Sequence, residues 1–198
     1  QRFSELVSKN GVETSFDLVQ NCLDYNERLT RIAVGNIPDG TYQEECFLDN
    51  DGVNLDENIH IKMKVTVKGD TMTVDFSEIP DTRKAPINSG KQAAISAARE
   101  VLVTVTLASP AASAQINQGS FAPLETIIRP GTLVDAVPPA PVACGGIVTM
   151  QCKALLWRAL SSVIPEKTGA GTFCGIPSTF IYGTNPKTGN RYIYIEGD

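Results

Sequence analysis

The chain has 198 residues, of which 42% are hydrophobic and 20% charged, and its net charge is −5 with the single histidine neutral. This composition is typical of a folded globular protein and argues against a disordered one. The acidic balance, with lysines and arginines scattered singly, argues against a nucleic-acid partner, and no apolar run approaches the roughly 20 residues that cross a bilayer.

The first predicted element is an amphipathic helix over residues 14–32. Its apolar residues recur at spacings of 4, 3, 4 and 3, which places them on one face of the helix: Leu18, Cys22, Tyr25, Leu29 and Ile32. Thr14 is a suitable N-cap, because Asp17 follows three residues later. Gly35 and Pro38 are expected to end the helix.

Three strands are predicted next, over residues 42–48, 59–67 and 72–76. Apolar and polar residues alternate through 59–67, which is typical of a strand with one buried face. His60 falls on the polar face of that strand. Lys68-Gly69-Asp70 supplies the turn to the third strand, so the pattern predicts an antiparallel meander.

The second half of the chain alternates helices and strands. We expect a helix to about residue 107, introduced by a capping box of Ser89 and Gln92. A short strand at 124–128, a helix at 148–163 and a terminal hairpin of 179–182 with 191–195 should follow. The prolines at 138, 139 and 141 indicate a linker or an edge segment between them.

This order of elements predicts the α+β class, an antiparallel meander with three main helices packed on it. We expect one compact unit, in which residues 1–137 hold the first helix, the meander and the second helix, and residues 138–198 hold the third helix and the hairpin. Because the chain opens on Gln1 and closes directly after a strand-like run, we expect it to be an internal fragment of a longer polypeptide.

Few residues are candidates for metal or nucleotide chemistry. His60 is the single histidine and is expected at the surface, so neither a metal site nor a Ser-His-Asp triad is favoured. The loop with Asp49, Asp51 and Asp56 lacks the spacing of a calcium loop. No glycine-rich phosphate loop is present either.

The five cysteines are widely spaced, and no two form a Cys-x-x-Cys pair. This pattern favours free thiols in a reducing compartment. No signal peptide is recognisable at the N-terminus, so we expect a cytoplasmic protein. Cys144, just before a predicted helix, is the best candidate for a reactive thiol, although a structural cysteine is the favoured interpretation.

The most distinctive stretch is Val74–Ser89. Its first residues, Val74-Asp75-Phe76-Ser77, end a strand, and Ala85-Pro86-Ile87-Asn88-Ser89 leads into the second helix. Asp75 and Ser77 fall on the polar side of the sheet. There they either stabilise a turn, as short polar side chains often do, or face a ligand or partner.

These two blocks, in this order, resemble the hydantoinase B family. That family includes the B subunit of ATP-dependent N-methylhydantoinase, the matching half of 5-oxoprolinase and the alpha subunit of acetone and acetophenone carboxylases. Further blocks that resemble the family are residues 38–42, 49–52, 117–123 and 129–133. The chain departs from the family pattern at Ala85, Ala122 and Gly146, which leaves the particular substrate open.

The resemblance implies a parent enzyme that uses ATP to open a small cyclic amide, such as a hydantoin or 5-oxoproline. It also implies that the nucleotide is handled by a hydantoinase A-type subunit or domain, and that a divalent metal binds to a segment outside this chain. We therefore expect no metal or cofactor in this fragment, and no activity from it alone.

The resemblance also directs the choice of site candidates, which are Asp75, Ser77, Asn88 and Asn117. Two alternatives remain open at this point. The parent could be the alpha subunit of an acetone- or acetophenone-type ATP-dependent carboxylase, or the region could be a non-catalytic module that docks another subunit.

Overall fold

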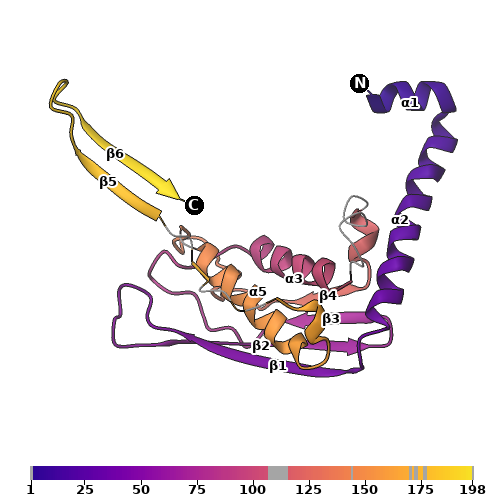
Figure 1. Cartoon of the computed structure of the whole chain (residues 1–198), viewed down its shortest axis with the longest axis horizontal. Coiled ribbons are helices and arrows are strands. Elements are labelled where there is room, and N and C mark those ends of the chain that lie inside the picture. Colours follow the sequence, from indigo (N-terminus) through magenta and orange to yellow (C-terminus); the bar gives the residue numbers. More distant parts are fainter. Residues whose placement is uncertain are drawn as a thin grey trace.

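The computed structural model describes residues 2–106, 116–143, 145–169, 171, 174–175 and 178–197. A four-stranded sheet with helices on one face forms the body of the molecule. A helical arm rises at one end of the body, and a two-stranded hairpin projects at the other (Figure 1). The α+β class is confirmed. Within the described part of the chain, no helix combines the length and apolar character needed to cross a membrane.

The sheet contains β1 (Gly40–Leu48), β2 (Ile59–Lys68), β3 (Thr71–Asp75) and β4 (Leu124–Ile127), in that spatial order. The first three strands form the predicted antiparallel meander. β4 instead pairs with β3 in parallel, which makes the sheet mixed. The reason is the intervening helix α3, because a helical crossover returns the chain to the same end of the sheet before the next strand begins.

The core lies between this sheet and two helices, α3 (Lys91–Thr106) and α5 (Gly145–Ser161). The apolar face of β2 is buried along its whole length, as its alternation predicts. Three buried alanines of α3, Ala94, Ala97 and Ala98, let α5 approach closely. The polar face of β2, including His60, remains outward.

The N-terminal arm contains two helices where the sequence predicts one. α1 (Arg2–Asn10) was not predicted, and α2 (Val12–Val34) begins before Thr14. Gly11 stands between them with φ 82° and offers no side-chain cap. The prediction of Thr14 as the N-cap is therefore wrong, because glycine's tolerance of positive φ sets the start of the helix. The predicted end at Gly35 is confirmed.

The apolar stripe of α2 is exposed instead of packed on the core. Leu18, Tyr25, Leu29 and Ile32 all lie at the surface. The buried residues are Ser15, Thr30 and Val34, which lie roughly 100° around the helix from the stripe. That buried face packs mainly on the 3-10 helix η1 (Gln118–Phe121) and only lightly on the sheet.

The proline-rich segment is an edge of the body and not a linker. Asp81 forms a bridge with Thr132, and Ile87 with Val142, so residues 132–142 run along the loop that precedes α3. The terminal hairpin is confirmed as β5 (Ser178–Thr184) and β6 (Arg191–Gly197), after a short 3-10 helix η2 (Pro165–Lys167). Residues 107–115, which include the expected end of the second helix at about residue 107, and Cys144 lie outside the described residues.

The start of α5 offers a matched test of this packing. A Cβ atom added at Gly145 would lie 2.6 Å from the Asn88 carbonyl oxygen, whereas one at Gly146 would meet nothing within 4 Å. Gly145→Ala should therefore lower the unfolding free energy by about 2 kcal/mol, while Gly146→Ala should leave it unchanged or raise it by up to ~1 kcal/mol. Urea denaturation followed by circular dichroism measures both. Equal stabilities would show that the start of α5 is not held against Asn88.

Candidate functional site

The loop between β3 and α3, residues 76–90, encloses a hollow of about 430 Å³ at the end of the sheet. This loop is the distinctive stretch that the sequence singles out. The hollow is polar and open, and only one of its lining residues comes from another segment. Its lining is Ser77, Glu78, Ile79, Pro80, Asp81, Thr82, Arg83 and Arg129.

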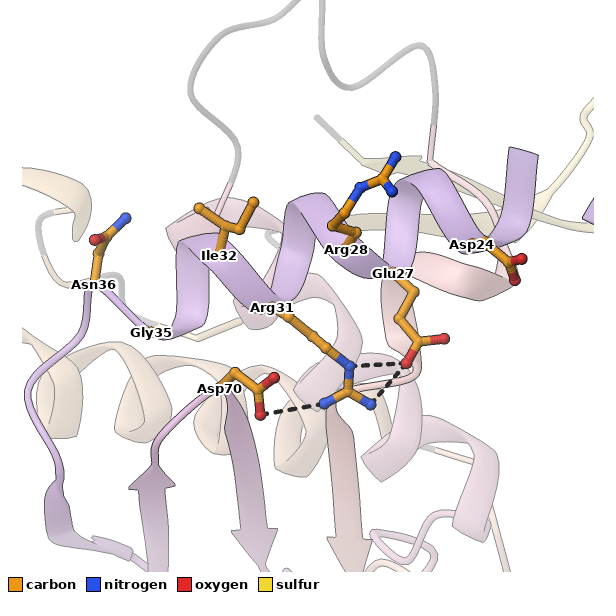
Figure 2. Close-up of a pocket in the computed structure, with 8 residues that line it drawn as sticks. All are labelled: Asp24, Glu27, Arg28, Arg31, Ile32, Gly35, Asn36 and Asp70. Carbon is orange, nitrogen blue, oxygen red and sulfur yellow. Dashed lines mark hydrogen bonds and ion pairs between the residues drawn. The ribbon is translucent and has the colours of Figure 1, made fainter. Parts of the chain in front are cut away.

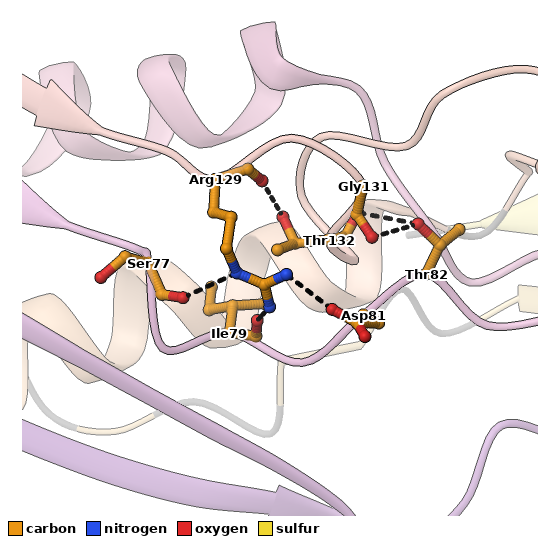
Figure 3. Close-up of polar contacts among 7 residues, drawn as sticks. All are labelled: Ser77, Ile79, Asp81, Thr82, Arg129, Gly131 and Thr132. Atoms are coloured by element: carbon orange, nitrogen blue, oxygen red, sulfur yellow. Dashed lines mark hydrogen bonds and ion pairs between the residues drawn. The ribbon is translucent and has the colours of Figure 1, made fainter.

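Arg129, which follows β4, binds the first part of this loop, residues 77–81 (Figure 3). Its Nε donates to the Ser77 carbonyl at 3.2 Å and its Nη2 to the Ile79 carbonyl at 3.0 Å. Its Nη1 lies 2.7 Å from a carboxylate oxygen of Asp81. The planar guanidinium can bind three acceptors at once because its five N–H groups have a fixed geometry.

A second contact holds the same two segments together. The Thr82 hydroxyl donates to the Gly131 carbonyl at 2.6 Å, and the Thr82 amide donates to the same oxygen at 2.9 Å. Gly131 has φ 78°, which a residue with a side chain rarely adopts. The turn at 129–131 therefore fixes the loop through both Arg129 and Gly131.

Asp75 and Ser77 form one local turn at the entrance to the loop. The Ser77 amide donates to Asp75 Oδ1 at 2.8 Å, and Lys64 Nζ lies 3.5 Å from Asp75 Oδ2. Partial burial raises the pKa of Asp75, but the hydrogen bonds from Ser77 and the charge of Lys64 outweigh it, so the pKa is lowered. Asp75 is therefore ionised at neutral pH and cannot act there as a general acid.

Glu78 continues this charged surface beside the sheet. Its two oxygens each lie 2.9 Å from a lysine ammonium, one from Lys62 and one from Lys64. Hydrogen bonds from these lysines lower the pKa of Glu78 to about 2. The pairs balance positive and negative charge, so this edge can bind and orient a polar ligand but contains no group poised to exchange a proton near pH 7.

Asn88 holds the loop from behind, inside the protein. Its side chain is fully buried. Its Nδ2 lies within 3.0 Å of the carbonyls of Arg83, Ala85 and Pro141, and its Oδ1 accepts from the Arg83 amide at 2.8 Å. Because donors and acceptor are all used, Asn88 positions the loop and has no free group for a ligand.

Ser89 has a different role from the predicted capping box. α3 begins at Lys91. The Ser89 amide donates to the Leu133 carbonyl at 2.7 Å, and the Ser89 hydroxyl lies 3.4 Å from the same oxygen. The capping prediction is therefore wrong, because the serine belongs to the junction with residues 132–136.

Asn117 lies in another network, at the junction of η1 and α2. Its Oδ1 accepts from the Gly119 amide at 2.9 Å, and Ser120 completes a capping box with it. Its Nδ2 donates to the Cys22 carbonyl at 3.1 Å. Of the four sequence candidates, Ser77 and Asn88 thus lie in the loop and Asp75 at the end of β3 beside it, while Asn117 joins η1 to α2.

Arg129 is the residue that sequence reasoning missed. The sequence showed it as the first residue of an Arg-Pro-Gly turn, within the block 129–133 that resembles the family, and did not mark it as a site residue. A single arginine at a strand end carries no information on which loop it will contact.

Residues with metal-binding side chains do not converge. His60 Nε2 lies 3.0 Å from Glu45 Oε2, and the ring stacks on Phe47 at a centroid distance of 4.5 Å. Among the residues that the structure describes, no three or more His, Cys, Asp or Glu side chains are arranged to hold a metal ion. These residues therefore do not fit the divalent metal that the family resemblance implies for the parent.

Other hollows also lie among the described residues. An open one of about 660 Å³ borders the C-terminal half of α2, where Arg31 binds Glu27 at 2.7 Å and Asp70 at 3.4 Å (Figure 2). A smaller one of about 160 Å³ lies between β1 and α5 beside Cys46 and Trp157. Burial raises the pKa of Cys46, so its thiol is protonated at neutral pH.

The sequence predicts free thiols, and three of the cysteines within the described residues agree with this prediction. Cys22, Cys46 and Cys152 form no disulfide. Burial also raises the pKa of Cys152 strongly, which makes it a structural residue of the core and not a nucleophile.

Comparison with known proteins bears on the whole chain. The hydantoinase B/oxoprolinase family model matches residues 1–197. A protein of Pseudomonas sp. (strain NS671), named as the B subunit of a D-/L-hydantoinase, is 27% identical over 183 residues, which cover 86% of this chain and 30% of that protein. The acetophenone carboxylase delta subunit of Aromatoleum aromaticum is 25% identical over 191 residues, 93% of this chain and 27% of that protein. The chain therefore spans less than a third of the length of these relatives.

The fold also has a solved counterpart. The ATP-dependent caprolactamase from Pseudomonas jessenii matches with a TM-score of 0.75 over 96% of this chain and 32% of that chain. The sequences are 24% identical, so this likeness establishes the fold alone. The family resemblance seen in Val74–Ser89 is confirmed, although the carboxylase relative is a delta and not an alpha subunit.

The pairing of Glu78 predicts a specific acid sensitivity. Because the folded-state pKa is lowered from 4.5 to about 2, Glu78 stabilises the fold above pH 4.5, and this stabilisation is lost as the pH falls toward 2. Glu78→Gln should make the acid transition take up about one proton fewer. The slope of unfolding free energy against pH between these limits measures this uptake. Glu166→Gln, on η2, is the control, and equal slopes for both variants would contradict the assignment.

Proposed function

The chain belongs to the hydantoinase B/oxoprolinase family, and we propose that it forms part of the B-type subunit of an ATP-dependent enzyme that opens a cyclic amide such as a hydantoin or 5-oxoproline. The observation that carries the proposal is the 27% identity, over 86% of this chain, to the B subunit of a hydantoinase. Since the chain spans 30% of that relative, the activity is proposed for the longer protein.

The chemistry explains why such an enzyme uses ATP. An amide carbon is a poor electrophile, and the amide oxygen is a poor leaving group. Transfer of the γ-phosphoryl group of ATP to this oxygen releases ADP and makes the carbon more electrophilic. Water can then add to this carbon, and the ring C–N bond breaks to leave the freed amine and an acyl phosphate. A second water hydrolyses the acyl phosphate, which releases phosphate and the open-chain acid. The nucleotide is assigned to a hydantoinase A-type partner, either a separate subunit or a domain.

The contribution that we propose for this chain is to bind and orient. The loop at 76–90 presents Asp75 and Ser77 at its entrance, fixed by Lys64 and by Arg129. Polar groups held this firmly suit the positioning of a small polar ring or the lining of its site. Asn88 would support the site from behind, because its side chain binds the backbone around the loop, whereas Asn117 joins η1 to α2.

The test is an assay of the complete protein together with its A-type partner. ADP release that depends on a hydantoin, a lactam or 5-oxoproline, with one ring opened per ATP, is the expected result. Asp75→Asn should lower this turnover by about tenfold, because it removes the charge beside Lys64 while keeping an acceptor for the Ser77 amide. Asp51→Asn is the matched control, since Asp51 also accepts from backbone amides, those of Val53 and Asn54.

Two results would contradict this proposal. ADP release that requires bicarbonate and a ketone would assign the parent to the carboxylases. The likeness to the acetophenone carboxylase relative is the reason for testing this alternative. Equal turnover of the two aspartate variants would remove Asp75 from the site and leave it a purely structural role in the turn.

A second candidate function is docking of a partner protein, favoured by the exposed stripe of α2. Its 4-3-4-3 spacing is that of a helix–helix seam, and a different face of α2, roughly 100° around the helix, already packs on its own chain. Both relatives are named as subunits. We assign the stripe to an apolar helix of the A-type partner.

Leu29→Asp in the complete protein should weaken binding of the A-type partner by tenfold or more, because a charge would enter an apolar seam. Turnover per assembled complex should be unchanged. Leu55→Asp is the matched control, since Leu55 is also exposed but lies in the loop between β1 and β2. Binding measured by calorimetry decides, and equal affinity of the two variants would exclude the stripe as the docking site.

A further inference from the structure

The terminal hairpin is apolar on both of its faces. Phe180 pairs with Ile195 and Tyr182 with Ile193, so these four side chains share one face. The other face carries Ile181, Tyr192 and Tyr194. All seven are exposed, from 46% for Ile181 to 78% for Tyr182.

This pattern is that of strands inside a protein. An antiparallel pair with one face in water alternates apolar and polar residues, whereas strands buried on both faces are apolar throughout. An isolated two-stranded hairpin is also only marginally stable in water. β5 and β6 therefore have the sequence of interior strands in a position where nothing described covers them.

The body of this chain does not supply the cover. Figure 1 shows the hairpin projecting away from the sheet and its helices. Within the described residues, its extensive contacts are those between its own two strands. Each strand also keeps one edge unpaired in this two-stranded sheet, and such edges readily accept another strand.

The scarcity of charged residues in the hairpin argues against a polar partner for its two faces. Between Ser178 and Gly197 the charged residues are Lys187, Arg191 and Glu196, and Lys187 lies in the turn. A surface with seven large apolar side chains and so few charges fits an apolar protein layer, and not an acidic or basic partner.

We propose that β5 and β6 are interior strands of a second sheet that the rest of the same polypeptide completes, by adding a strand at a hairpin edge and covering both faces. The proposal rests on the proposed function in taking the chain as part of a longer B-type protein. The relatives are long enough, since the chain spans 30% and 27% of two of them.

The same polypeptide is favoured over a separate partner protein for a physical reason. A hairpin that is marginal alone acquires its stability only together with its cover, so the cover has to be present as the polypeptide folds. The stripe of α2 differs, because α2 already packs on its own chain through another face. The stripe can therefore remain uncovered until a partner binds.

The experiment compares hydrogen–deuterium exchange in this chain alone and in the complete polypeptide that its gene encodes. Edge amides of β5 and β6 should exchange rapidly in the chain alone and at least about 100-fold more slowly in the complete polypeptide. Amides of β2 should be protected in both, which shows that the body is folded.

A matched pair of variants tests the side chains. Ile193 and Val53 are equally exposed in this chain, 65% and 66%. Ile193→Asp should lower the melting temperature of the complete polypeptide by about 4 °C or more and leave that of the chain alone unchanged. Val53→Asp should change neither.

Other occupants give different results, and each overturns the proposal. Protection that appears only when the A-type partner is added would assign the hairpin to that interface. Dimers of this chain that protect β5 and β6 would assign it to a second copy. A hairpin that exchanges rapidly in the complete polypeptide, or a gene product without further chain, would leave it uncovered.

The ring-opening assay on the same preparation separates the two proposals. A protected hairpin in a protein without ring-opening activity would refute the proposed function and leave the second sheet standing. Ring-opening activity with an unprotected hairpin would support the proposed function and refute the second sheet.

Discussion

The body of this protein depends on the buried amide side chain of Asn88. It connects the loop before α3 to the proline-rich segment through the Pro141 carbonyl, 53 residues away. An unpaired buried amide costs about 1–3 kcal/mol for each group left without a partner, so every backbone group around it has to stay in place. The close approach of Gly145 to the Asn88 carbonyl follows from the same junction.

That junction gives the candidate site its rigidity. Asn88 fixes the loop from the inside, and Arg129 fixes it from the outside through two carbonyls and Asp81. The result is a polar edge whose charges are paired, with Asp75 and Glu78 both ionised at neutral pH because hydrogen bonds and lysine neighbours lower the pKa of each. Such an edge suits binding and orientation better than proton transfer.

The two exposed apolar surfaces, the stripe of α2 and the terminal hairpin, are where we expect this chain to contact other polypeptide. The stripe of α2 is apolar on one face of a helix that packs on its own chain through another face, as expected for a surface that a partner covers later. The hairpin is apolar on both faces, as expected for an element that folds only with its cover. Both surfaces stand at opposite ends of the body (Figure 1), so the body with the candidate loop lies between them.

The sequence by itself determined the family and most of the elements, although not α1. Alternation over residues 59–67 predicted β2, and the Val74–Ser89 blocks led to the family, because periodicity and motif order are local properties of the chain. Only the tertiary structure decided which face of α2 is buried, that β4 runs parallel to β3, and that Arg129 and Asn88 hold the loop. Those outcomes depend on contacts between residues some 50 to 95 positions apart, and local patterns carry no record of such contacts.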